Sequence, residues 1–403
     1  MELARICAGY TPGQSDRLRQ AMTHKRSDEE MAKLRAETYA GMASREITGK
    51  AADEIWEKLQ GFSSFGFPES HSVSFAYIVY MSAWLKLHWP TEFLAGLLNA
   101  QPMGFFSPNS LVQDAGRHGV VVLPPDVNES DYDCTVVPWD ADPDETIEHL
   151  GMEWRRGRGA RDDPIRMATA LRMGLRYVRN LGDAEITRIE AARLHAPFAS
   201  VVDLAQRTGI AVRGLEGLAA AGALASLGVE RREGLWAAGA LSGMGPDRLP
   251  LVEGADPPVL PLMSRLEEAQ ADLWSTGLSV HHPVEFVREG LAAQGCLTVA
   301  EALAGRRHGR RARVGGIVTH RQRPMTARGV IFFNLEDETG ILNVVVLPDV
   351  WFGQRGVARR SVGLVVDGVL EYRDGVTNLV ARRFTGWPAS GVRSRDWAGG
   401  GRG

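Results

Sequence analysis

The chain has 403 residues, of which 44% are hydrophobic and 24% are charged, and its formal net charge is −3. This is the composition of an ordinary globular protein, and the length predicts roughly two to four domains. The small negative charge excludes a protein that is basic throughout, so any nucleic-acid-binding surface must be local. Cys7, Cys134 and Cys296 lie too far apart for a zinc-finger spacing, and three cysteines form no disulfide framework.

The first 60 residues are predicted to form helices. Thr11-Pro12 is typical of a helix start, because proline is tolerated at the first helical position. Ser27 and Glu30 have the spacing of a capping box. A further helix is predicted over residues 51–59, with Gly61 as its end.

The longest apolar run extends from Val73 to Leu87. A helix that is apolar on all sides is buried in a large protein or spans a membrane. This run is shorter than the roughly 20 residues that a span requires, so the sequence predicts a core helix. Pro90 ends it, and Thr91 can cap the helix that follows.

Ser70 and His71 lie where this apolar helix begins. The first N–H groups of a helix are free and bind anions readily, so the pair is a candidate phosphate contact. The pattern alone favours a simpler interpretation, in which Ser70 only caps the helix and His71 is an ordinary polar side chain.

The run GFPESHSVSFAYIVYMSAWLKLHWPTEFLAGLLNAQ closely resembles the fingers region of bacterial family C DNA polymerases, the polymerase III alpha-subunit family. The Ser-His pair, the Trp-Leu-Lys spacing and the His-Trp-Pro-x-Glu-Phe ending carry the resemblance. Residues 99–120 resemble the error-prone branch. The resemblance implies nucleotide or primer–template contacts by Lys25, Arg26, Ser70, His71 and Lys86. For Lys25 and Arg26 the alternative is a solvated helix end.

Residues 120–137 predict one or two strands. Asp131 and Asp133 would share one face of a strand, and two-metal phosphoryl transfer needs such a carboxylate pair. The pair instead resembles the connector after the family's fingers, and the family's catalytic aspartates lie in a palm upstream of anything present here. His281 and His282 have no partner ligands at metal spacing. We therefore expect no catalytic residue and no bound metal in this chain.

The charged segment at residues 140–163 predicts a loop. Its arginines are Arg155, Arg156, Arg158 and Arg161, and the neighbouring acids favour a solvated loop over a phosphate-binding patch.

Residues 173–191 predict two helical stretches around a tight turn at Asn180-Leu181-Gly182. The segment resembles a helix–hairpin–helix, whose hairpin offers backbone N–H groups to a DNA phosphate. Asparagine replaces the usual first glycine, and it tolerates the left-handed conformation. A purely structural corner is the alternative. The candidate contacts with the DNA backbone are Arg176, Arg179, Asn180, Gly182 and Arg188. A second such element, at residues 213–227, has few cations and is expected to pack rather than to bind.

Residues 311–384 alternate in the manner of strands, with hairpin turns at residues 338–340 and 373–375. This spacing predicts a small barrel, and the segment resembles the family's OB-fold. OB-folds bind single strands through a positive groove and stacking aromatics, so the candidates are Arg321, Arg323, Arg328, Phe332 and Phe333. By alternation one of the two phenylalanines faces the core. The acidic run at residues 336–338 is expected only to form a turn.

The predicted fold is a multidomain α+β protein with a helical fingers portion, a helix–hairpin–helix region and a C-terminal all-β OB-fold barrel. The expected domains are residues 1–118 for the C-terminal part of the fingers, 119–165 for a β-containing connector, 166–241 for the helix–hairpin–helix region, 242–310 for a linker with short helices, 311–385 for the OB-fold and 386–403 for a disordered tail.

The resemblance covers essentially the whole chain but only the C-terminal portion of the family's architecture. It implies part of an error-prone DNA polymerase active in damage-induced translesion synthesis, repair and replication. The complete enzyme would use Mg²⁺, dNTPs, a DNA primer–template and single-stranded template, with accessory mutagenesis proteins and, indirectly, the sliding clamp as partners. Without a palm the chain is expected to be inactive alone.

A cytoplasmic location without membrane contact is expected, because neither a signal peptide nor a membrane span is recognised. Three alternatives to the polymerase interpretation remain open. The first is a non-enzymatic DNA-binding protein, and the second is a module that docks a mutagenesis partner. The third is an isolated part whose apolar helix lacks its packing partner, so that an exposed apolar patch causes aggregation.

Overall fold

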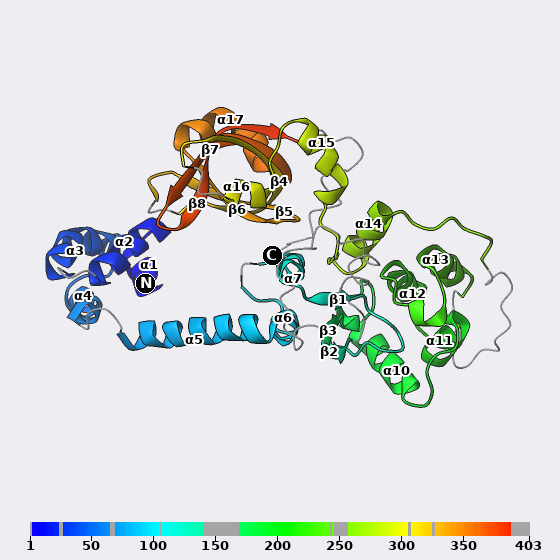
Figure 1. The fold of residues 1–403 in the computed structure, drawn as a ribbon. Helices are drawn as coiled ribbons and strands as arrows, with labels where there is room; N and C mark the ends of the chain where they lie inside the picture. Colours follow the sequence, from blue (N-terminus) through cyan, green and yellow to red (C-terminus); the bar gives the residue numbers. More distant parts are fainter. Residues whose placement is uncertain are drawn as a thin grey trace. The chain divides into compact units, whose positions relative to one another are not determined.

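The computed structural model describes residues 2–23, 27–64, 69–104, 106–139, 169–241, 244–245, 257–304, 308–324 and 327–387 (Figure 1). It divides into two compact units, Met1–Ala83 and Trp84–Gly403, which are described separately. Several expected features lie outside the described residues: Lys25, Arg26, the arginine cluster at residues 155–161, most of the segment at 242–256 and nearly all of the tail at 386–403.

The first unit is helical. Its helices are α1 (Glu2–Ala8), α2 (Pro12–Thr23), α3 (Ser27–Ala43), α4 (Lys50–Ser64) and the first part of α5 (Glu69–His88). Leu18, Met31 and Met42 are fully buried in its core. The predicted starts at Pro12 and Ser27 are confirmed, but the predicted stop at Gly61 is wrong because α4 continues through it. A glycine inside a helix costs only about 1 kcal/mol relative to alanine, which the surrounding helix formers can offset.

Helix α5 forms over the predicted apolar run, but the expectation that it is a core helix is wrong. Val73, Tyr77, Val79 and Tyr80 are 60%, 67%, 63% and 71% exposed. An apolar run shows that a helix can be buried, whereas burial also needs elements that pack on every side of it. The described residues do not supply them. None of the described helices is both long enough and apolar enough to cross a membrane.

The second unit begins with a small α/β layer. Its elements are α6 (Pro90–Asn99), α7 (Pro108–Arg117), β1 (Val121–Leu123), β2 (Thr135–Pro138) and β3 (Thr169–Arg172). β3 lies between the other two strands, parallel to β1 and antiparallel to β2. Leu98 and Leu171 are fully buried where α6 meets this sheet. The strands predicted in residues 120–137 are confirmed as β1 and β2.

A group of short helices follows the sheet. They are η2 (Leu175–Tyr177), α10 (Asp183–Arg193), α11 (Val201–Thr208), α12 (Val212–Ala220), η3 (Ala225–Leu227) and α13 (Arg231–Ala240). Ile186, Ile189, Leu204, Leu215 and Leu218 are fully buried in their common core. The first arm of the predicted hairpin is only a three-residue 3₁₀ turn, η2, rather than the expected helix.

The barrel is the last part of the second unit. It is preceded by α14 (Arg265–Ser275), η4 (Glu285–Val287), α15 (Arg288–Ala293) and α16 (Val299–Leu303). Its elements are β4 (Arg311–Gln322), β5 (Ile331–Asp337), β6 (Gly340–Val346), α17 (Pro348–Arg360), β7 (Gly363–Arg373) and β8 (Val376–Gly386). The strands close in the order β4-β5-β6-β8-β7 (Figure 1). The predicted OB-like barrel is confirmed, as is the hairpin turn at Asp374-Gly375, where both residues have positive φ.

The acidic run is predicted to form a turn, but only Glu338 lies in one, because Glu336 and Asp337 are the last residues of β5. Glu336, Asp337 and Glu338 are 2%, 0% and 5% exposed. The Arg117 guanidinium of α7 donates to Glu336 Oε1 at 2.9 Å. Burial raises the pKa of Glu336 and of Glu338, and the facing guanidinium groups of Arg117 and Arg288 oppose that shift.

Arg288 is the cation that serves the other two carboxylates. Its Nε donates to Glu338 Oε1 at 2.6 Å, and its Nη2 donates to Asp337 Oδ2 at 2.8 Å and to Glu338 Oε2 at 2.7 Å. Asp337 Oδ2 also accepts from the backbone N–H of Val299 at 2.8 Å. Arg117, Arg288 and the three carboxylates together form what we call the acidic-turn cluster. His282 lies nearby, and burial lowers its pKa to about 3, so it stays neutral beside the two arginines.

The exposed face of α5 should make the isolated chain associate. We expect Tyr77→Ser with Tyr80→Ser to lower light scattering and the binding of an apolar-surface dye, because exposed apolar patches drive association. The matched control is Val376→Ser, which removes a single exposed apolar side chain on the barrel. Equal scattering by both variants would show that α5 is not the associating surface.

The acidic-turn cluster predicts a large stability effect at Arg288. Arg288→Met leaves two buried carboxylates without their cation, and we expect a loss of about 3–5 kcal/mol in the free energy of unfolding, measured by denaturant titration. Arg313→Met is the control, since its 2.7 Å ion pair with Asp367 lies at the surface and should matter much less. Similar losses in the two variants would contradict the assignment.

Candidate nucleic-acid interface

The hairpin turn between η2 and α10 has the predicted backbone. Asn180 adopts a left-handed conformation, with φ of 62°, so asparagine does replace glycine at this position. Leu181 is buried in the helical core, while Asn180 and Gly182 are exposed. The buried Leu181 side chain therefore holds the turn on the helical core, while the backbone on either side of it faces outward.

Arg179 ties the turn to two neighbouring helices. Its N–H donates to Ser275 O at the end of α14 at 2.6 Å, and its guanidinium carbon lies 5.2 Å from the centre of the Trp274 ring. Its carbonyl lies so close to α12 that a Cβ at Gly217 would come within 2.2 Å of the oxygen. The Arg179 side chain is exposed and remains a candidate phosphate contact.

Arg176 and Arg188 hold the turn in place. Arg176 Nη1 donates to Asp133 Oδ1 at 2.7 Å and to Asn99 O at 3.3 Å, and its guanidinium carbon lies 5.4 Å from the Tyr132 ring centre. Arg188 Nε donates to Thr208 O at the end of α11 at 2.7 Å. Both arginines thus have structural bonds, and Arg188 is also an exposed residue.

The backbone N–H group of Gly182, a predicted phosphate donor, has an acceptor within the chain. Glu185 Oε2 accepts it at 3.0 Å, and Glu185 Oε1 accepts the N–H of Ala211, the N-cap of α12, at 3.0 Å. One carboxylate therefore serves the N-terminal ends of both α10 and α12. In this conformation the Glu185 carboxylate occupies the place beside the Gly182 N–H where an external phosphate would have to bind.

The five candidate residues of the barrel differ in position: one lies in the core, and the others lie near the end of β4, on the outer face or in the loop between β4 and β5. Phe333 is fully buried, so it is the inward phenylalanine, and Phe332 is half-buried on the outer face. Arg321 pairs across the strands with Phe333, and its guanidinium donates to Ala358 O at 3.0 Å and to Ser361 O at the end of α17. Burial lowers the pKa of Arg321. Arg323 and Arg328 are exposed in the loop between β4 and β5.

The outer face of the barrel has a further feature that the sequence did not predict. The strand register aligns Asn334 of β5, Asn343 of β6 and Asn378 of β8 side by side on the outside of the barrel. No short sequence window could reveal this row, since β6 pairs with β8 in parallel across an intervening helix and strand.

Two of the fingers candidates, Lys86 and His71, have described side chains. Lys86 forms an ion pair with Asp114 of α7 at 2.6 Å, and His71 packs edge-on against Phe75 with ring centres 4.5 Å apart. The Ser70 side chain lies outside the described residues, as do Lys25 and Arg26.

The two aspartates of the connector have separate structural partners. Asp131 Oδ1 accepts from Arg193 at 2.9 Å, and Asp133 Oδ1 accepts from Arg176 at 2.7 Å. Within the described ranges, no group of three or more His, Cys, Asp or Glu side chains is placed to hold a metal ion. His281 contacts Glu285 at 3.2 Å, and His282 Nδ1 accepts from Val284 N at 3.2 Å.

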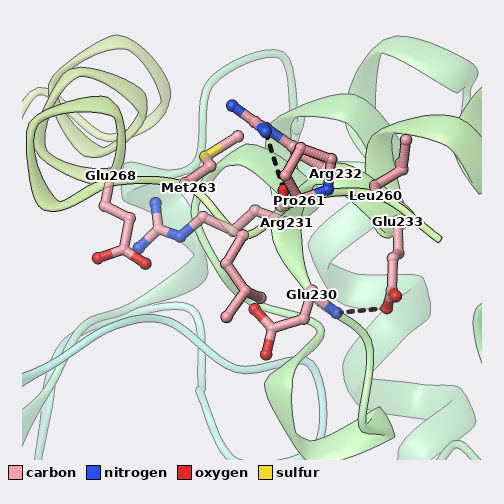
Figure 2. A pocket seen from close by; sticks show the side chains of 9 residues that line it. Glu230, Arg231, Arg232, Glu233, Leu260, Pro261, Met263 and Glu268 are labelled. Carbon is pink, nitrogen blue, oxygen red and sulfur yellow. Dashed lines mark hydrogen bonds between the residues drawn. The ribbon is translucent and has the colours of Figure 1, made fainter.

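Figure 2 shows a pocket between the start of α13 and the segment before α14. Its two arginines have partners within the chain: Arg231 pairs with Asp272 at 2.7 Å, and Arg232 donates to Pro261 O at 2.8 Å. Glu230, Glu233 and Glu268 also line it. With its cations paired and its remaining charges acidic, the pocket is poorly suited to a phosphate.

Comparison with known proteins gives two family matches. Residues 1–46 match the bacterial DNA polymerase III alpha subunit finger domain, and residues 119–234 match a helix-hairpin-helix motif. The curated "Error-prone DNA polymerase" of Mycobacterium bovis is 44% identical over 402 residues, 98% of this chain and 34% of that protein. Those of Mycolicibacterium paratuberculosis and Corynebacterium efficiens are each 43% identical over the same shares.

The chain thus spans about a third of the length of these relatives. Among solved structures, asparaginyl-tRNA synthetase from Pyrococcus horikoshii matches 22% of the chain at 20% identity, and its TM-score of 0.19 is too low to support any argument.

The bond from Glu185 to two helix ends predicts a stability effect. We expect Glu185→Ala to lower the free energy of unfolding by about 1 kcal/mol or more, because both N–H groups lose their acceptor. Glu233→Ala is the matched control, since among the described residues Glu233 accepts one backbone N–H, that of Glu230 at the start of α13. Thermal unfolding of both variants measures the difference, and a larger loss for Glu233→Ala would contradict the bridging role.

Proposed function

We propose that this chain belongs to the error-prone branch of the bacterial DNA polymerase III alpha-subunit family and is the C-terminal DNA-contacting portion of an error-prone polymerase that acts in damage-induced translesion synthesis. The observation that carries the proposal is 44% identity over 98% of the chain to proteins of that name. The match to the helix-hairpin-helix family and the OB-like barrel support a role in DNA contact.

We place catalysis in the part of the polymerase that lies outside this chain. Primer extension by two-metal chemistry needs Mg²⁺ held by paired carboxylates. Asp131 and Asp133 each neutralise an arginine, which argues against their use as ligands. The complete enzyme would bind Mg²⁺ and the dNTP elsewhere, and this chain alone would not extend a primer.

The chain would contact DNA at two places. The exposed tip at Arg179 and Asn180 presents a cation and a polar turn to duplex phosphates, with Gly182 open to them only if the Glu185 carboxylate moves away. The barrel presents Arg323, Arg328 and Phe332 to the single-stranded template, where the arginines neutralise phosphates and the ring stacks on a base. Arg176, Arg188 and Arg321 would position these surfaces, and Phe333 would support the ring-bearing strand from the core.

In the complete enzyme the fingers residues Lys25, Arg26, Ser70, His71 and Lys86 would face the nucleotide or the primer–template. Accessory mutagenesis proteins and, through them, the sliding clamp would be the protein partners. The site of action would be the cytoplasm, where bacterial DNA lies.

A salt series of equilibrium binding tests the proposal. The probe is a fluorescent primer–template with a single-stranded overhang, and affinity should fall steeply as salt rises, because each neutralised phosphate releases counterions. We expect Arg323→Ala and Arg328→Ala each to reduce the slope of log affinity against log salt by about 0.7, and Arg179→Ala to reduce it by about 0.9. Arg313→Ala, whose guanidinium is paired with Asp367, should leave the slope unchanged.

Two outcomes would overturn parts of this proposal. A folded sample that binds no DNA at low salt would end the DNA-contact role. Magnesium-dependent primer extension by this chain alone would contradict the placement of the catalytic carboxylates outside it.

A second candidate function is protein docking through α5. The apolar side chains of Val73, Tyr77, Val79 and Tyr80 are more than half exposed, as at a surface that another polypeptide covers. Since the relatives are about three times as long, the expected occupant is the remainder of the polymerase. Co-purification of a separately expressed remainder with the wild-type chain, and its loss with Tyr77→Ser and Tyr80→Ser, would support docking.

A further inference from the structure

The outer face of the barrel carries a row of three asparagines on three paired strands. Asn334 pairs with Asn343, and Asn343 pairs with Asn378. Directly opposed side chains on one face of a sheet lie roughly 5 Å apart at Cβ, so the three amides form a continuous strip about 10 Å wide. We call Asn334, Asn343 and Asn378 the asparagine row.

The row is costly for the barrel, and no compensating side-chain bond is seen for it among the described residues. Asparagine is disfavoured in strands, where β-branched and aromatic residues pack better. Asn343 is exposed and the other two are half-buried, and among the described residues none of the three amide groups has a hydrogen-bond partner. Residues that are unfavourable for their secondary structure, and that make no stabilising contact in return, are typical of functional positions.

The position of the row matches the surface that OB-folds use for oligonucleotides. It lies on the second and third strands of the barrel, β5 and β6, and continues onto β8. Phe332 lies two residues before Asn334 on the same face, opposite Val345 of β6. Arg323 and Arg328 are exposed in the loop that joins β4 to β5. The amides and the aromatic ring thus share one face, and the loop that leads into β5 carries two exposed cations.

The two ends of the row differ chemically. His320 pairs with Asn334 on β4, and its ring lies edge-on to Phe106 at 5.0 Å. At the other end Asn378 pairs with Glu371 of β7, whose carboxylate is exposed. An anionic backbone would therefore avoid the Glu371 end and approach the strip from the side of Arg323 and Arg328.

We propose that the asparagine row contacts the bases of single-stranded DNA by hydrogen bonding to their edges. An amide offers both a donor and an acceptor, which is the pairing that base edges require, and asparagine can bond to adenine through both groups. The arginines contact phosphates, Phe332 stacks on a base, and the amides distinguish strands that carry bases from a bare sugar–phosphate chain. This inference rests on the proposed DNA-contact role of the barrel.

The test compares base-bearing and abasic oligonucleotides. A triple variant with Asn334→Thr, Asn343→Thr and Asn378→Thr keeps polar side chains with a better preference for strands, so it should fold at least as stably as the wild type. We expect at least a tenfold loss of affinity for a fluorescent single-stranded oligonucleotide, with an unchanged salt slope. Affinity for the abasic oligonucleotide should not change.

Two controls separate the outcomes. Arg323→Ala should lower the salt slope for both oligonucleotides, and Thr385→Ala, at an exposed position of β8 outside the row, should change nothing. Wild-type binding of both oligonucleotides that is unaltered in the triple variant would overturn the asparagine row while leaving DNA contact intact. A folded wild-type chain that binds neither oligonucleotide would overturn both the row and the proposed function.

Discussion

The arrangement of the second unit depends on the neutralisation of three consecutive buried carboxylates. Glu336 and Asp337 end strand β5, Glu338 follows in the turn, and isolated carboxylates are very costly to bury. Their cations come from outside the barrel: Arg117 from α7 and Arg288 from α15. The barrel is therefore complete only when the helices before it are in place, so the OB-like fold is an integral part of this unit rather than a tethered module.

Features that depend on local chemistry could be predicted from the sequence. The left-handed turn at Asn180 follows from the few residue types that tolerate positive φ, and the start of α2 follows from Pro12. The alternation of strand residues limits Phe332 and Phe333 to one inward ring, and the structure identifies it as Phe333. The barrel itself follows from regularly spaced strands and their turns.

Features that depend on distant partners could not be predicted. The acidic run reads as a turn because nothing near it in sequence reveals Arg117, which is 219 positions away from Glu336. The exposure of α5 could not be inferred from its own apolar residues, since burial depends on what surrounds a helix. Glu185 looks like an ordinary first-turn acid until α12 places the N–H of Ala211 beside it. In each case the missing information is tertiary contact.

The close approach of Gly217 to the carbonyl of Arg179 limits how this region can evolve. Any side chain at position 217 would displace the backbone of the hairpin turn, because a Cβ would come within 2.2 Å of that oxygen. A substitution on α12 would then alter the exposed tip, which lies on a different segment of the chain. Residue 217 and the turn must therefore change together, and a homologue with a larger residue at 217 should carry a compensating change at the turn.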